Sequence, residues 1–501
     1  MQRRPLLQAL AGLAAGAALP AGARPASAEA FDAAAASQPL LTPLKGVSDA
    51  TGDRDAQALL RGRWPAELRG RFHRNGPALF ERAGERYHHW FDGDGMVQQY
   101  TLDGTHVRHR GRLVRTAKLA AEQRAGRFQM QTLGTWIEGA PPVTGPDSMN
   151  TANTNALEHG GRLLAMWEGG SAIAMDPTDL STRGPVTWGA GLQQLPFSAH
   201  PKVGPDGHLW NIGTQGDKLI VWHIGPDGHL LRVQVGGLPF AGGMVHDMAI
   251  TERHLVVPLP PVRLNFGRPV DGGPRRFALV PGEPLRVLVM EKADITKRRV
   301  FELPAEMVFH VGNAHDTTEG VALSWVGAPD AWFLDRGAVD LLAGRPTADP
   351  GAVHLRIGRF DLARGRVQVD AHAGEVEFPR VHPARVGQRA RFLALGAAWP
   401  AHAARSKLPL LHGVQLFDTE TGRVRRFDYG EQAIAEEHVI VPKPGTSGEL
   451  DAWLLGTTFD ARRQATVLNL LDAAHLEDGP VAQAVLPYAL PLGFHGNFQA
   501  G

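Results

Sequence analysis

The stretch GPDGHLWNIGTQGDKLIVWHIGPDGHLL, residues 204–231, carries the pattern that decides the fold. Its first seven residues, GPDGHLW, are nearly repeated as GPDGHLL at residues 225–231, a shift of 21 positions. Each Pro-Asp-Gly segment can supply the positive φ that a tight hairpin turn requires. The residues between the copies are rich in Trp, Ile, Val and Leu, so the spacing predicts successive antiparallel strands.

Turn signals of the same kind recur along the chain, while helical signals are scarce. Short x-Gly turns follow apolar runs at residues 102–104, 363–365 and 420–422. The clearest expected helix is TAKLAAEQRAG at residues 116–126, with a short one at Pro304-Ala305-Glu306. A large all-β chain must close or repeat to avoid a long exposed sheet edge. A β-propeller is one of the few such solutions for a chain of this size, and the periodicity alone does not exclude a large double sandwich.

The composition excludes several classes of protein. The chain has 501 residues, with 52 Lys plus Arg against 51 Asp plus Glu and a net charge of +1. Because phosphate recognition needs clustered cationic side chains, we expect no nucleic-acid partner. The chain has 0 cysteines. It therefore has no disulfide, thiolate nucleophile or iron–sulfur cluster, and any metal must be bound by histidines and carboxylates.

The N-terminus has the layout of a secretory signal. Arg3 and Arg4 precede an apolar run over residues 6–19, and Ala28 ends a small-residue cleavage pattern. The arginine pair resembles a twin-arginine signal, with an ordinary Sec signal as the alternative. We therefore expect residues 1–28 to be a signal peptide that directs export to the periplasm. Residues 29–40 are expected to be a mobile linker, and residues 41–501 a single domain.

Four of the 22 histidines stand out by their surroundings. His200, His246, His310 and His495 each follow apolar or small residues near an expected strand end. Their separations of 46, 64 and 185 residues are too wide for a local zinc motif. They could meet only on an axis, such as the central channel of a propeller. From these residues alone, a metal site and four core histidines both remain open. His106 and His109 have arginine-rich neighbours, which favours a solvated face.

Several longer motifs occur in one order along the chain. They are RFHRNGP (71–77), YHHWFDGDGM (87–96), NTNALEHGGRLLAMWEGG (153–170), HPKVGPDGHLWNIG from His200, VHDMAITERHLVVPLPP (245–261), EFPR (377–380) and FHGNF (494–498). In these motifs the chain resembles the carotenoid cleavage oxygenases, which include the retinal pigment epithelium isomerase and bacterial stilbene-cleaving dioxygenases. The resemblance implies an all-β, seven-bladed propeller with a metal on its axis and a helical or loop cap over a substrate tunnel.

The resemblance also implies a cofactor and a reaction. One Fe(II) per chain would be held by His200, His246, His310 and His495. In the resemblance, the carboxylates that orient these histidine ligands map to Glu168, Glu377 and Glu437. Glu436 lies beside Glu437 and remains an alternative to it. The implied reaction is cleavage of a C=C bond of a carotenoid or apocarotenoid by O2 to give two aldehyde or ketone products. The implied tunnel walls are Trp167, Phe197, Phe309 and Phe494, which core packing would explain equally well.

Two other functions remain open from the sequence. In a phenolic stilbene cleaver, Tyr87 and Lys118 would bind and deprotonate the phenol of the substrate. A non-enzymatic propeller that binds an apolar ligand is a further alternative, against which the four histidines argue. An insoluble polyene substrate would favour peripheral contact with a membrane, to which residues 256–266 could contribute an apolar rim.

Overall fold

The computed structural model describes residues 27–240, 243–265, 267–269, 273–347 and 353–501. The signal expected over residues 1–28 therefore lies almost wholly outside the described residues. Among the helices that are described, none has the length and apolar character needed to cross a bilayer.

Seven antiparallel sheets of four or five strands make up a β-propeller in the described part of the chain. From inside to outside, blade 1 holds β34 (His495–Ala500), β3 (Arg69–Leu79), β6 (Asp94–Asp103), β7 (Val107–Leu113) and β1 (Arg54–Gln57). Blade 2 holds β8 (Asn155–His159), β9 (Arg162–Met166), β10 (Ile173–Met175) and β11 (Thr182–Pro185). Blade 3 holds β12 (Lys202–Val203), β13 (Leu209–Gln215), β14 (Lys218–Ile224) and β15 (Leu230–Gly237).

The remaining blades follow in chain order. Blade 4 holds β16 (Ala249–Ile250), β17 (His254–Leu259), β20 (Leu285–Glu291) and β21 (Asp294–Leu303). Blade 5 holds β22 (Met307–Asp316), β23 (Gly320–Ala328), β24 (His354–Asp361) and β25 (Arg366–Gly374). Blade 6 holds β26 (Val376–Arg380), β27 (Phe392–Ala397), β28 (Gly413–Asp418) and β29 (Val424–Asp428). Blade 7 holds β30 (Ala433–Pro442), β31 (Ala452–Asp460), β32 (Ala465–Asp472), β33 (Pro480–Val485) and β2 (Leu59–Gly62).

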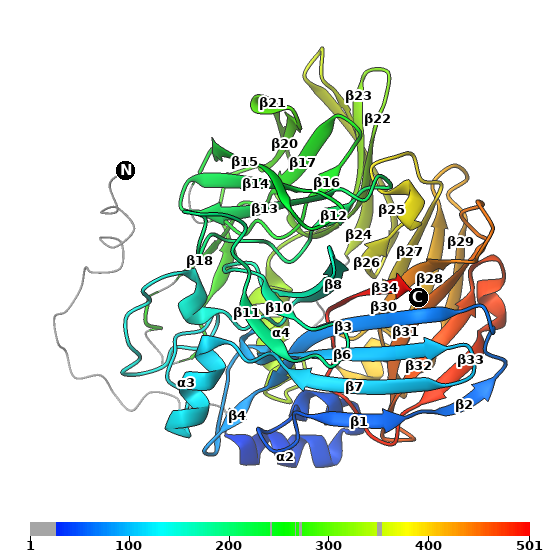
Figure 1. Ribbon diagram of the computed structural model, residues 1–501. Helices are drawn as coiled ribbons and strands as arrows, with labels where there is room; N and C mark the ends of the chain where they lie inside the picture. The colour runs from blue at the N-terminus through cyan, green and yellow to red at the C-terminus, as the bar shows by residue number, and fades with distance from the viewer. Residues whose placement is uncertain (1–26, 241–242, 266, 270–272, 348–352) are drawn as a thin grey trace.

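The two ends of the chain close the ring. The last strand, β34, pairs antiparallel with β3, from Gly70 opposite Ala500 to Asn75 opposite His495. At the other seam β2 pairs with β33, so N-terminal strands complete two blades that also hold the C-terminal strands. Figure 1 shows β34 lying beside β3. This closure places His495 on the inner strand of blade 1.

The structure confirms the hairpins predicted from residues 204–231. β13 pairs with β14 and β14 with β15, and the glycines of the two Pro-Asp-Gly turns, Gly207 and Gly228, have φ of 78° and 79°. The longer expected helix is also present, as α3 (Ala117–Ala125), capped by Thr116. The short helix expected at Pro304–Glu306 is wrong, because only these three residues connect β21 to β22, too few for a helical turn.

Three further expectations are corrected by burial. The segment expected to be a mobile linker contains α2 (Ala28–Ser37), followed by the 3-10 turn η1 (Pro39–Lys45), and Phe31 is buried beneath the Arg86 guanidinium. Its alanine run favours helix, and one aromatic anchor holds that helix on the propeller. His109 is buried rather than solvated, because it lies on the inward face of β7. Residues 256–262 are likewise buried and do not form the expected apolar rim, whereas residues 263–265 are partly or fully exposed and Phe266 lies outside the described residues.

Candidate metal centre and substrate cavity

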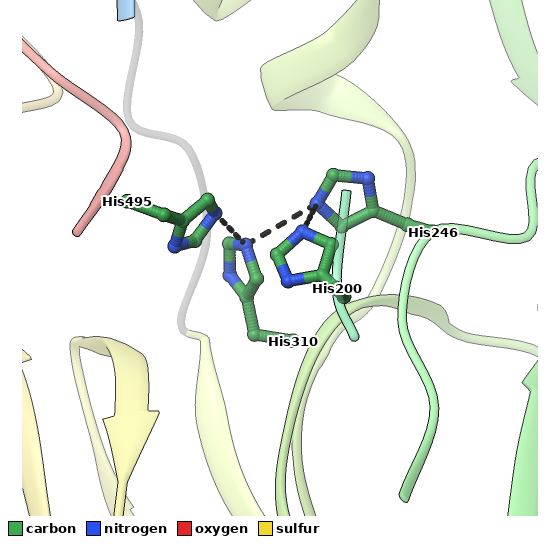
Figure 2. Close-up of side chains that lie close together, drawn as sticks. All are labelled: His200, His246, His310 and His495. Carbon is green, nitrogen blue, oxygen red and sulfur yellow. Dashed lines mark hydrogen bonds between the residues drawn. The ribbon is translucent and has the colours of Figure 1, made fainter. Parts of the chain in front are cut away.

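The four singled-out histidines come from the inner edges of four blades. His200 lies two residues before β12 and His246 three residues before β16, while His310 lies in β22 and His495 begins β34. All four are buried, and Figure 2 shows their rings turned toward a common centre. Their separation in the sequence is overcome because the inner strands of all blades surround one axis.

The spacing of the ring nitrogens fits a metal ion. Nε2 of His246 is 2.9 Å from Nε2 of His200 and 3.3 Å from Nε2 of His310, which is 3.1 Å from Nε2 of His495. The four ligand atoms all lie within 4.8 Å of one another. Metal–nitrogen bonds of about 2.1 Å at right angles place neighbouring nitrogens about 3.0 Å apart. The four residues therefore could hold one metal ion.

Three carboxylates face the outward nitrogens of these rings. Nδ1 of His246 is 2.9 Å from Glu168, Nδ1 of His310 is 2.5 Å from Glu377, and Nδ1 of His495 is 3.0 Å from Glu437. An Nδ1–H that is donated to a carboxylate leaves a lone pair on Nε2. Nε2 lone pairs that face one another at 2.9–3.3 Å repel unless a cation lies between them. Such an arrangement is typical of a metal site.

Each of the seven blades contributes one member of this arrangement. The histidines occupy blades 1, 3, 4 and 5. Glu168 follows β9 of blade 2, whereas Glu377 lies in β26 of blade 6 and Glu437 in β30 of blade 7. The seven residues are therefore positioned by the ring itself and not by one local loop.

Burial and pairing set the protonation states at this site. Burial lowers the pKa of His200 well below its usual value and that of His495 to about 4. Burial also lowers the pKa of His310, but the neighbouring Glu377 outweighs it and leaves that pKa raised. Burial alone would raise the pKa of Glu437, yet Arg380 and His495 hold it well below its usual range. The ionised Glu437 carboxylate thus faces His495, whose neutral imidazole can act as a ligand.

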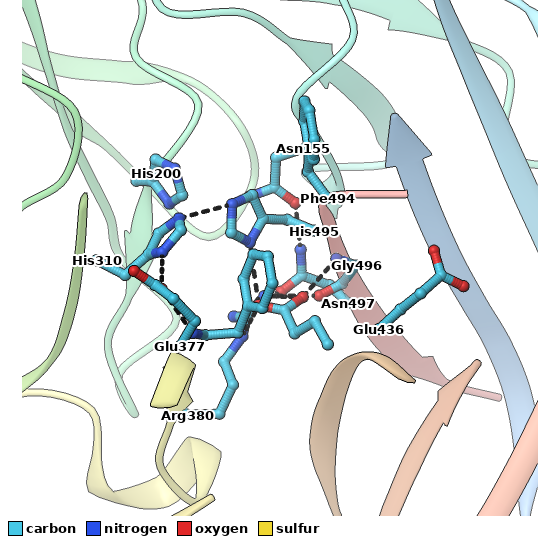
Figure 3. A network of polar contacts seen from close by, with 12 residues as sticks. Asn155, His200, His310, Glu377, Arg380, Glu436, Phe494, His495, Gly496 and Asn497 are labelled. Carbon is cyan, nitrogen blue, oxygen red and sulfur yellow. Dashed lines mark hydrogen bonds and ion pairs between the residues drawn. The ribbon is translucent and has the colours of Figure 1, made fainter. Parts of the chain in front are cut away.

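Arg380 is the functional residue that the sequence did not single out. Its Nε and Nη2 donate to the two oxygens of Glu437 at 2.8 and 3.0 Å, and Nη2 also donates to the Gly496 carbonyl at 2.8 Å. Figure 3 shows Arg380 beside His495 and Gly496. Arg380 therefore holds the carboxylate that orients His495. Its only sequence signal was the charge that ends EFPR.

The structure also distinguishes Glu437 from its neighbour. Glu436 accepts hydrogen bonds from Arg74 at 3.2 Å and from Thr457 at 2.5 Å. Successive residues of a strand point to opposite sides, but a register shift between Ala435 and His438 brings both glutamates into buried polar contacts. Only Glu437 contacts His495.

A large cavity of about 810 Å³ ends at the histidines. Trp167, Phe309 and Phe494 line it, as do Trp90 and Phe91. Its outer part is lined by segments between blade strands, including residues of η4 (Phe333–Gly337) and α5 (Pro400–Ser406). These segments form the expected cap, together with α4 (Ala338–Leu342), which continues directly from η4.

Phe197 is not a wall of this cavity. Its ring stacks on Trp188 at a centroid distance of 5.0 Å and lies 5.9 Å from Trp222. It is wholly buried in the apolar layer between blades 2 and 3. The prediction that Phe197 contacts substrate is wrong, because its side chain points away from the axis.

Tyr87 and Lys118 meet, but away from the cavity. Nζ of Lys118 lies 2.8 Å from the Tyr87 hydroxyl, 2.9 Å from Asp94 and 3.0 Å from Glu122. All four side chains are buried, and none lines the cavity that ends at the histidines. Burial, followed by Asp94 and Glu122, raises the pKa of the Tyr87 hydroxyl well above its usual value. This pair is therefore an internal ion cluster and is not placed to bind a phenol.

Comparison with known proteins agrees with this geometry. The family described as RPE65, retinal pigment epithelial membrane protein, matches residues 49–500. The chain is 30% identical over 466 residues to the apocarotenoid-15,15'-oxygenase of Synechocystis sp., covering 88% of this chain and 92% of that protein. It is 29% identical over 460 residues to the lignostilbene-alpha,beta-dioxygenase isozyme III of Sphingomonas paucimobilis, covering 88% and 92%.

Solved structures show the same architecture. A variant of the Synechocystis apocarotenoid oxygenase superposes with a TM-score of 0.81 at 26% identity, covering 92% of this chain and 98% of that chain. The cobalt-substituted form of that oxygenase has a TM-score of 0.80 at 27% identity, covering 92% and 99%.

The propeller and its axial histidines define a class of enzyme, the alkene-cleaving dioxygenases, and this protein is an oxidoreductase of that class. More narrowly, the chain belongs to the RPE65 or carotenoid cleavage oxygenase family. A purely ligand-binding propeller, which the sequence had left open, is thereby set aside.

Proposed function

We propose that this protein is a non-haem Fe(II) dioxygenase that cleaves a C=C bond of a carotenoid or apocarotenoid. The observation that carries the proposal is the cavity of about 810 Å³, whose aromatic walls lead to three of the four histidines, His246, His310 and His495. An elongated polyene offers no polar group along its length, so an apolar wall can bind it and its position selects the bond that is cut.

Each part of the site has a task in this reaction. Iron(II) held by the four imidazoles would supply the activation of O2. Glu168, Glu377 and Glu437 keep three of the rings in the tautomer whose Nε2 faces the centre. Trp167 and Phe494 exclude water from the space beside the histidines and hold the polyene against it.

The rival substrate, a phenolic stilbene, needs a group that binds and deprotonates its phenol. The four tyrosines of the chain are Tyr87, Tyr100, Tyr429 and Tyr488, and none is among the described residues that line the cavity. Lys118 is held by Asp94 and Glu122. Because one relative is a lignostilbene dioxygenase, the assay includes a stilbene as the competing substrate.

The test is a product assay on paired substrates. Protein purified without oxygen and loaded with Fe(II) is given an apocarotenal or a hydroxystilbene under labelled O2, and the aldehydes are measured by mass spectrometry. We expect labelled aldehydes from the polyene, with kcat/KM at least about tenfold above that for the stilbene. Turnover of the stilbene alone would overturn the proposal.

A matched pair of variants tests whether the cavity is the binding site. Ala403 lines the cavity, whereas Ala401, on the same helix α5, is exposed and does not. We expect Ala403→Trp to raise KM for the polyene and Ala401→Trp to leave it unchanged. Equal effects of the two would place the substrate elsewhere.

We further propose that the protein is exported through a twin-arginine signal. The support is the Arg3-Arg4 pair ahead of a weakly apolar run. Cleavage after Ala28 would remove Ser27, whose hydroxyl caps α2 by accepting from the Ala30 N–H at 3.1 Å. Fractionation and the N-terminal mass of the mature chain test this, with the Arg3→Lys and Arg4→Lys double variant expected to stay in the cytoplasm.

A further inference from the structure

A second, much smaller cavity of about 80 Å³ also reaches the histidines. His200 lines only this cavity and His246 only the large one, whereas His310 and His495 line both. In β22 the large cavity touches Phe309 and the small one Val311. Along β26 and the residue on either side of it, the large cavity touches residues 375–378 and the small one residues 378–381. The histidines therefore separate two compartments that lie at opposite ends of the inner strands.

The two compartments differ in chemistry. The large cavity is walled mainly by aromatic and aliphatic side chains. The small axial cavity is lined by Lys202, Asp247, Asn313, Arg380 and Glu437 among others. A site this small holds only about two or three waters, at roughly 30 Å³ each. A hydrated dication loses much of its solvation in an apolar cavity, so the axial side is the less costly way to the ring nitrogens.

One ion pair dominates the axial cavity. Nζ of Lys202 lies 2.8 Å from Oδ1 of Asp247, whose Oδ2 accepts the Val311 N–H at 2.8 Å. The same Oδ2 is 3.9 Å from Nδ1 of His200, the one ring of the four without a glutamate beside it. The Arg380 charge is already engaged by Glu437. The Lys202 ammonium is thus the positive charge next to the open side of the histidines.

We propose that metal ions enter and leave the histidine site through this axial cavity and that Lys202 is an electrostatic gate on that path. The ammonium repels an arriving dication and neutralises the carboxylate that would attract it, so it slows both binding and release. The same barrier retains the metal between catalytic cycles. This inference rests on the proposed function in one respect, that the four histidines bind the metal.

The experiment measures metal exchange and does not depend on turnover. Apo-protein is mixed with Co(II) alone, uptake is followed by the cobalt absorption bands, and release is started with excess chelator. We expect Lys202→Gln, which keeps a donor for Asp247 but removes the charge, to speed uptake and release by at least about fivefold each. Lys202→Arg keeps the charge and should exchange at the wild-type rate.

Two further variants separate the routes. Val386 lines the axial cavity and Ala403 the large one. We expect Val386→Trp to slow cobalt uptake and Ala403→Trp to leave it unchanged, and this pair decides the route even if Lys202→Gln does not fold. Unchanged rates in folded Lys202→Gln, or slowing by Ala403→Trp alone, would overturn the proposal. Failure of the wild type to bind cobalt would instead count against the metal site of the proposed function.

Discussion

Two of the buried clusters of titratable side chains among the described residues differ in their suitability to bind a ligand. In the cluster of Tyr87, Asp94, Lys118 and Glu122, the ammonium donates to the hydroxyl and to both carboxylates. In the histidine cluster, Nε2 atoms face one another at 2.9–3.3 Å, and glutamates beside Nδ1 of three rings favour the tautomer that leaves those Nε2 atoms without a proton. Burial alone thus does not mark a functional site. The mark is a set of polar atoms that the protein leaves for something else to satisfy.

The largest expected effect comes from removing one metal ligand. In His310→Ala we expect activity to fall by more than about a hundredfold, because three imidazoles cannot hold the ion in the same geometry. Metal content and product formation are measured together, with circular dichroism as the check on folding. If His310→Ala kept its metal and its turnover, the four histidines would be core packing residues and not metal ligands.

Removing a member of the Lys118 cluster, whose polar groups bond to one another, should lower the stability of the fold and leave catalysis unchanged. Lys118→Met leaves Asp94 and Glu122 buried without their cation, and we expect a loss of about 3–5 kcal/mol in the free energy of unfolding. The fraction that folds should keep the wild-type ratio of polyene to stilbene turnover. Urea unfolding measures the first effect, and the paired substrate assay the second.

A surface ion pair provides the control for that variant. Lys45 pairs with Asp32 at 2.8 Å, with their side chains 58% and 49% exposed. Lys45→Met should change the free energy of unfolding by less than about 1 kcal/mol. If Lys118→Met selectively removed stilbene turnover, the cluster around Lys118 would have to be part of a substrate site and not only an internal ion cluster.

An intermediate effect is expected from the carboxylates behind the histidines. Glu377→Gln keeps the shape of the side chain but weakens the bond to Nδ1 of His310, so we expect metal affinity to fall about 10- to 100-fold. Arg380→Gln should act in the same direction through Glu437 and His495. Competition with a chelator measures both. An unchanged affinity in both variants would mean that the carboxylates only fill space.

The last expected effect is on the pH dependence of stability. Burial lowers the pKa of His109 to about 3, so the folded protein resists a proton that the unfolded chain accepts near 6.5. The folded-state pKa is depressed, so this part of the stability is present above about pH 6.5 and is lost as the pH falls toward 3, by up to about 1.4 kcal/mol per pH unit. In His109→Gln we expect a shallower decline.

The same hairpin offers a control for this titration. His106 is exposed in the turn that joins β6 to β7. Urea unfolding of His106→Gln between pH 7 and pH 4 should therefore follow the wild-type slope. If His109→Gln follows it too, His109 is not the group responsible.

The sequence by itself carried the strand periodicity, the hairpin turns and the family motifs. These features are local, because a Pro-Asp-Gly turn or an alternating strand is decided by a few neighbouring residues. They were enough to predict the all-β propeller and to single out the four histidines that the fold brings together. They also pointed to Glu168, Glu377 and Glu437, two of them on inner strands.

Only the tertiary structure decided which side chains reach the axis. Phe197 and Lys118 stand beside or between family motifs, yet one packs between blades and the other joins an internal ion cluster. Conversely, Arg380 and Lys202 lie inside family motifs that gave them no role, and only the structure shows that they contact Glu437 and Asp247, which are distant in the chain. The physical reason is that contacts between blades depend on closure of the ring, which pairs β34 with β3 and fixes the direction of every inner strand.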